Sequence, residues 1–261
     1  MIGFVRANLR WLSAGFLLTM FSGFGQTYFI SLSNNVLIER FDLTHGSLGL
    51  IYALATAASA IVLLEFGRIV DRVSTRMASL IVIAGLVGAI VLMAYAANLW
   101  MLFAALMTLR LFGQGMTGQV AMTATGRWFD AQRGRAVSIV ALGYPTSEAL
   151  LPPIAVFLFA VMPYETVWLL GALATVVIAA PALFFIPARE REASGTTAPE
   201  NDVEVAPKVS WRRGDVLKTP SFYLLLMGIL CPAFMVTCLF FHQLHLIEIK
   251  GWPMGVFAAG F

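Results

Sequence analysis

The amino-acid sequence predicts an all-α polytopic membrane protein. Of its 261 residues, 59% are hydrophobic and 12% are charged, and the mean hydropathy is +0.84. Soluble domains carry roughly 25% charged residues, and a soluble chain of this length has too small an interior for so much apolar surface. The apolar residues also gather in stretches of about 20, the length at which a helix crosses a bilayer. The lipid bilayer is therefore the expected surroundings of the chain.

We expect seven membrane-spanning helices. The apolar run of the first span continues past Phe29 without a signal-peptide cleavage pattern, so this span is predicted to be retained. The longest polar segment, Pro187 to Pro220, is rich in Ser, Gly, Thr and Pro and predicts a flexible linker. The predicted spans are residues 11–33, 46–66, 77–97, 99–126, 136–160, 166–187 and 221–245.

The positions of lysine and arginine predict the orientation of these spans. With a cytoplasmic N-terminus, fourteen of the 17 basic residues lie on the cytoplasmic side, two lie opposite, and Arg110 lies inside a span. This bias is the one that the positive-inside rule describes. The net charge of +3 is thus explained by topology rather than by a nucleic-acid partner. We expect a multi-pass protein of the plasma (inner) membrane.

The loop after the second predicted span carries the motif GRIVDRVSTR, residues 67–76. Gly67, Asp71, Arg72 and Arg76 follow the pattern Gly-x-x-x-Asp-Arg-x-Gly-x-Arg, with Ser74 in place of the second glycine. This motif resembles the loop between helices 2 and 3 of the major facilitator superfamily. There it acts as a conformational latch at the cytoplasmic face, and the resemblance implies the same role for these four residues.

Two further motifs carry the same resemblance. The stretch RLFGQG, residues 110–115, is similar to the Arg-x-x-Gly-x-Gly of helix 4 in that superfamily. Residues 127–136 resemble its cytoplasmic loop from helix 4 to helix 5, in which Asp130, Arg133 and Arg135 stand. The resemblance extends over the whole chain. It implies two six-helix halves, each built of 3+3 inverted repeats, that face each other across a midplane site.

This plan predicts how the chain is divided. Residues 1–187 are expected to form the N-terminal six-helix bundle, 188–220 a cytoplasmic linker, and 221–261 helix 7 and the start of helix 8. The second bundle would then be incomplete. We therefore expect a chain truncated at its C-terminal side, as a fragment of a twelve-helix protein or as a short product.

Arg110 is the foremost candidate for a site residue. It stands eleven residues into its span, ~16 Å from the outer surface and close to the middle of a ~30 Å hydrocarbon core. Because a charge at that depth is costly, the guanidinium must face protein, water or a counter-charge. Glu148 stands twelve residues into the fifth span, and the two depths differ by only ~4 Å. We therefore expect Glu148 to be the counter-charge of Arg110.

Two interpretations of this pair stay open. In the first, it is a permanent buried ion pair that fixes helix 4 against helix 5. In the second, Glu148 takes up a proton and Arg110 is then free to bind an anionic substrate.

Three polar side chains complete the candidate set for substrate binding or proton coupling. They are Gln26, Gln114 and Tyr144. Gln26 follows Thr19 and Ser22 at spacings that would place all three on one helix face. In the superfamily, helices 1 and 4 line the central cavity. Such residues also form hydrogen bonds between neighbouring helices, and both roles stay open.

The leading functional hypothesis is a secondary active transporter that works by alternating access. Its expected substrate is a small organic anion such as a carboxylate, coupled to protons or exchanged, because the layout resembles the branch that carries monocarboxylates and oxalate or formate. The alternatives are an exporter of drugs or hydrophobic compounds and a truncated non-transporting membrane protein. No metal-ligand cluster, Ser-His-Asp set or nucleotide loop is recognised, so we expect neither an enzyme nor a cofactor or metal.

Overall fold

The computed structural model describes residues 2–70, 73–129, 132–179 and 213–252, and these residues form helices and no strand. Five of the described helices are long and apolar enough to cross a membrane, and Tyr164–Ala179 is a shorter apolar helix. The predicted all-α polytopic membrane protein is confirmed. The end of the predicted sixth span (180–187), most of the predicted linker (188–212) and the predicted start of helix 8 (253–261) lie outside the described residues.

The first predicted span is interrupted. Its elements are α1 (Ile2–Ala7), α2 (Leu9–Phe21), the 3₁₀ turn η1 (Ser22–Gly25), α3 (Thr27–Ile30), the 3₁₀ turn η2 (Ser31–Ser33) and α4 (Asn34–Phe41). Between η1 and α3 the backbone of Gln26 is extended, with φ −82° and ψ 152°. The prediction that Thr19, Ser22 and Gln26 share one helix face is therefore wrong, because helical spacing ends at Gly25.

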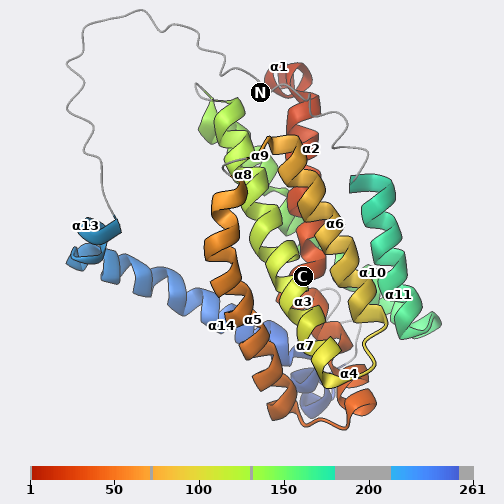
Figure 1. Ribbon diagram of the computed structural model, residues 1–261. Coiled ribbons are helices and arrows are strands. Elements are labelled where there is room, and N and C mark those ends of the chain that lie inside the picture. The colour runs from red at the N-terminus through yellow and green to blue at the C-terminus, as the bar shows by residue number, and fades with distance from the viewer. Residues whose placement is uncertain (1, 71–72, 130–131, 180–212, 253–261) are drawn as a thin grey trace, which may run out of the picture.

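The other predicted spans appear as helices in the expected order (Figure 1). The second and third are α5 (His45–Val70) and α6 (Thr75–Ala94), and the fourth is α7 (Leu99–Thr108), the π-helical segment η3 (Leu109–Met116) and α8 (Thr117–Trp128). The fifth is α9 (Arg133–Ala141) with α10 (Gly143–Val161), and the sixth is α11 (Tyr164–Ala174) with the π segment η4 (Thr175–Ala179). The short α13 (Arg213–Leu217) precedes the seventh, α14 (Pro220–Lys250).

Local sequence signals set several helix ends. The Ser74 hydroxyl accepts a hydrogen bond from the Met77 amide at 3.3 Å, and the Asn98 side chain accepts one from the Met101 amide at 2.9 Å, so each caps the start of a helix. At the C-terminal end of α14, Gly251 has a φ of +63° and stops the helix. A left-handed backbone of this kind is what glycine adopts without steric cost.

The six-helix bundle, residues 2–179, is organised around helices 1 and 4 of the chain. α2 packs against α8, α9 and α10, and α6 packs against α7 and α11. The side chain of Trp168 is completely buried and its indole nitrogen donates to the Ser33 hydroxyl at 3.1 Å, which ties α11 to η2. Such hydrogen bonds between helices are the structural role that the sequence left open for the Ser and Thr residues.

A close backbone approach joins the two interrupted helices. A Cβ atom built on Gly25 of η1 would overlap the carbonyl oxygen of Leu109 and lie 2.6 Å from Gly113 Cα in η3. Neither backbone can yield without moving its whole helix. Glycine is thus required on both sides, and the crossing brings the two irregular segments together at one level.

The helix α14 lies differently from the other helices. Figure 1 shows it running away from the bundle at an angle, with α13 at its far end. Its described N-terminal part is mostly exposed, and its buried residues, Phe241, Gln243, Leu244 and Ile247, all lie near its C-terminal end. There it packs against α3 and η2 of the first helix.

Candidate functional site

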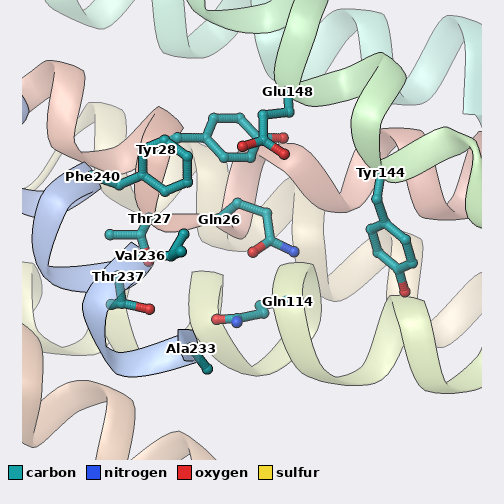
Figure 2. Close-up of a pocket in the computed structure, with 10 residues that line it drawn as sticks. All are labelled: Gln26, Thr27, Tyr28, Gln114, Tyr144, Glu148, Ala233, Val236, Thr237 and Phe240. Atoms are coloured by element: carbon teal, nitrogen blue, oxygen red, sulfur yellow. The ribbon is translucent and has the colours of Figure 1, made fainter. Parts of the chain in front are cut away.

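A polar pocket lies where the interrupted first helix, the fourth and fifth helices and α14 meet. Its cavity volume is about 320 Å³, at the lower end of the range of ligand sites. Figure 2 shows Glu148, Gln26 and Gln114 one beneath another, with the residues of α14 on one side and Tyr144 on the other. The lining residues are Gln26, Thr27, Tyr28, Gln114, Tyr144, Glu148, Ala233, Val236, Thr237 and Phe240.

Four of the five predicted coupling candidates line this polar pocket. They are Gln26, Gln114, Tyr144 and Glu148. They come from three separate helices, and two of them owe their positions to interruptions: Gln26 follows η1, and Gln114 lies within the π segment η3. π segments occur often at functional sites, because the extra residue in the turn turns side chains away from the regular helical rows.

Glu148 is the charged residue of the polar pocket. It is half-buried in α10, and in the described part of the chain its carboxylate makes no hydrogen bond and no ion pair. Its neighbour in the sequence, Ser147, is buried and accepts a hydrogen bond from the Tyr28 hydroxyl at 2.9 Å, which anchors α10 to α3. The carboxylate is therefore held in place by its helix while its oxygens stay available.

Arg110, the fifth candidate, lies behind the polar pocket and is 7% exposed. Its Nη1 donates to the carbonyl oxygen of Gly25 and to the hydroxyl of Thr27, both at 3.3 Å. Its guanidinium carbon lies 5.4 Å from the centre of the Tyr52 ring, within the range of a cation–π contact. Its Nε is buried and has no partner among the described residues.

The predicted ion pair between Arg110 and Glu148 is wrong. The two residues do lie on neighbouring helices, but Arg110 points toward the first helix rather than toward the fifth. The physical reason is the interruption of the first helix. The turn at Gly25 exposes a carbonyl oxygen that a regular helix would have used, and the guanidinium satisfies it. Depth along the membrane was similar for both charges, but depth alone does not fix the direction of a side chain.

Six lining residues were not predicted. They are Thr27, Tyr28, Ala233, Val236, Thr237 and Phe240. The sequence signal for the first two is the pair Gly23 and Gly25, which weakens the helix just before them. The four residues of α14 carried no such signal, because nothing in an apolar run tells which face meets another helix.

Beyond the lining itself, α14 is attached to the first helix by polar contacts. Gln243 Nε2 donates to the Ser31 hydroxyl at 2.8 Å and to the Tyr28 carbonyl oxygen at 3.2 Å. Asn34 donates to the carbonyl oxygen of Phe241 at 2.9 Å. Gln243 and Asn34 were not among the predicted site residues, although polar side chains in an apolar span are a general signal for contacts between helices.

The latch motif lies only partly within the described residues. Asp71 and Arg72 lie outside them, as does Asp130 of the following motif. Gly67 is in the last turn of α5, and Arg76 is in the first turn of α6 and half-exposed. The role of these four residues as a latch stays a prediction.

The two described arginines of the loop between helices 4 and 5 lie at the start of α9. The side chain of Arg133 lies against Gly126 of α8. The guanidinium carbon of Arg135 lies 5.9 Å from the centre of the Phe4 ring, which connects α9 to α1. These contacts place both arginines at one end of the bundle, away from the polar pocket.

Interrupted helices that bring polar side chains to a pocket between membrane spans are typical of secondary transporters. A comparison with protein families supports this class: residues 15–261 match the Major Facilitator Superfamily. The match covers more than half of the chain, and the protein therefore belongs to this superfamily of secondary transporters. A search of curated proteins found no match.

Proposed function

We propose that the polar pocket is a transport site for a small organic solute and that Glu148 is its proton-exchanging group. The single observation that carries this proposal is the state of that carboxylate. It lies in a membrane-spanning helix, faces the pocket and has no hydrogen-bond or ion-pair partner among the described residues. An unpaired carboxylate at such a position is expensive, so a proton or a positively charged solute would stabilise it.

Alternating access gives this exchange a direction. When the polar pocket opens to one side of the membrane, Glu148 would release its proton there. Binding of the solute or of a new proton would then accompany the opening of the pocket to the other side. The N-terminus is proposed to be cytoplasmic and the membrane to be the plasma (inner) membrane. This agrees with the bias of the basic residues and with the position of α1 and the starts of α6 and α9 at one end of the bundle (Figure 1).

A small organic anion is the second candidate substrate, as the sequence predicted. The observation that favours it is the buried Nε of Arg110, which has no partner among the described residues. Against it, Nη1 is already bonded to Gly25 and Thr27, and Arg110 does not line the polar pocket. An anion would reach this guanidinium only if the contacts with the first helix were rearranged.

The test is an infrared measurement of carboxyl protonation. The purified chain in nanodiscs is taken from neutral to acidic pH while the carboxylic acid C=O band is recorded. We expect a band that is missing in Glu148→Gln and retained in Glu39→Gln, which changes an exposed glutamate of α4. The same spectra in wild type and Glu148→Gln would contradict the proposal. Equal melting temperatures of the variants serve as the check that both have folded.

A further inference from the structure

We propose that the solute of the polar pocket is an organic cation, in particular a primary alkylamine that carries an aromatic ring, rather than an organic anion. The inference rests on the proposed function, since it takes the polar pocket to be the solute site. It differs from the expectation drawn from the sequence, in which Arg110 was the partner of an anion. Three observations support it: the charge of the lining, its aromatic residues, and its hydrogen-bond acceptors.

The first observation is the charge. Among the ten lining residues, Glu148 is the one with a formal charge, and it is negative. Arg110 is separated from the cavity by Thr27, whose hydroxyl it contacts. An anion in the polar pocket would lie beside an unpaired carboxylate with no lining cation to offset the repulsion. An ammonium group would instead supply the counter-charge that Glu148 lacks.

The second observation is an aromatic wall next to that carboxylate. The rings of Tyr28 and Phe240 meet edge to face, with centres 5.9 Å apart and an angle of 73° between the planes. Figure 2 shows both rings at the same end of the polar pocket as Glu148. A ring face attracts a cation and accepts an aromatic solute by stacking. Aromatic rings and a carboxylate together suit a solute that carries both an aromatic group and an amine.

The third observation is the set of neutral polar groups. Gln26 and Gln114 bring amide oxygens, and Thr237 brings a hydroxyl oxygen to the polar pocket, whereas the Thr27 hydroxyl is already bonded to Arg110 and Tyr52. A primary ammonium group has three N–H donors and no acceptor. Carboxylate, amide and hydroxyl oxygens from four helices can therefore satisfy all three donors at once.

The titratable groups around Glu148 lead to a pH dependence. Tyr28 from α3 and Tyr144 from α10 line the polar pocket, the lining residues of α14 and η3 carry no charge, and Arg110 lies behind Thr27. A proton and an ammonium group would thus compete for one carboxylate. Lowering the pH should weaken binding of the amine, since protonation removes the negative charge that holds it.

The experiment compares two probes of opposite charge, phenethylamine and 3-phenylpropionate. Binding of each to the purified chain in nanodiscs is measured by calorimetry near neutral pH. We expect the amine to bind at least about tenfold more tightly than the acid, and Glu148→Gln to remove that preference. Phe240→Leu should weaken amine binding about threefold to tenfold, as the loss of a partly desolvated cation–π contact does. Glu39→Gln is the matched control and should change neither affinity.

Several results would overturn the inference. They are tighter binding of 3-phenylpropionate, binding of neither probe, and an amine affinity that Glu148→Gln leaves unchanged. The pH dependence of amine binding to the wild type tests the inference without any variant, and so does not depend on whether Glu148→Gln folds. An amine affinity that does not fall on acidification would also contradict the inference. If the infrared band of Glu148 is present while the amine preference is not, the cation inference fails and the proposed proton exchange stands.

Discussion

The six-helix bundle and α14 are both made of apolar helices, yet they are held in different ways. Within one apolar stretch of 18 residues in each membrane-length span, between 17% and 50% of the residues are buried in the bundle, against 6% in α14. In the bundle, small residues such as Gly25 and Gly113 allow close backbone contact. α14 is attached instead by side-chain amides such as Gln243, near one end.

The difference follows from the solvent. Lipid does not drive apolar side chains together as water does, so an apolar helix gains little by packing unless its surface fits a neighbour closely. The bundle has that fit and α14 has it only near its C-terminal end. We therefore expect polar contacts to contribute more to the position of α14, and close fit of the surfaces to contribute more to the packing of the bundle.

The largest effect is expected when the same substitution is made in both regions. Gly25→Ala forces a methyl group into the backbone of η3 and should lower the free energy of unfolding by at least ~2 kcal/mol. Gly228→Ala in α14 meets no atom within 4 Å and should change it by less than ~1 kcal/mol, toward higher stability, because alanine favours a helix. Unfolding in detergent, followed by circular dichroism, measures both. Equal effects would refute the distinction between the two regions.

An intermediate effect is expected when α14 loses its amide contact. Gln243→Ala removes donors to the Tyr28 carbonyl and the Ser31 hydroxyl, which together contribute ~1–2 kcal/mol. Amides of residues 241–250 should exchange with deuterium faster, while those of α6 keep their protection. Gln119→Ala, at an exposed position of α8, is the control. Unchanged exchange in α14 would mean that apolar packing, not the amide, holds this helix.

The smallest effect concerns a charged contact at the surface of the bundle. Arg40 Nη1 and Glu165 Oε1 lie 3.0 Å apart, and their side chains are 35% and 39% exposed. Because water screens such pairs, Glu165→Gln should cost at most ~1 kcal/mol, and less in high salt. Melting temperatures at low and high salt, beside Glu39→Gln, measure it. A larger loss than that of Gln243→Ala would reverse the expected order of polar contacts.

Much of the fold could be predicted because membrane insertion depends on local sequence. An apolar run of about 20 residues has to be helical in lipid, where every backbone amide needs an internal partner. The five membrane-length helices and their order follow from this requirement. The interruption at Gln26 and the π segment around Gly113 were not predicted, since both depend on a contact between helices far apart in the sequence.

The candidate site was predicted to a similar extent. Polar residues in apolar spans are costly and so tend to meet one another, which is why Gln26, Gln114, Tyr144 and Glu148 reach one pocket. The partner of Arg110 was predicted wrongly, because a carbonyl oxygen freed by an irregular turn leaves no mark in the sequence of side chains.

The sequence by itself determined that this chain is a polytopic membrane protein, which of its segments are apolar and long enough to cross a bilayer, and which polar residues are too costly to face lipid. These are properties of single segments and their solvent. The tertiary structure alone decided that Arg110 supports the turn at Gly25 while Glu148 faces the polar pocket without a partner among the described residues. That choice depends on the directions of side chains across a helix crossing, which arise only when the segments pack.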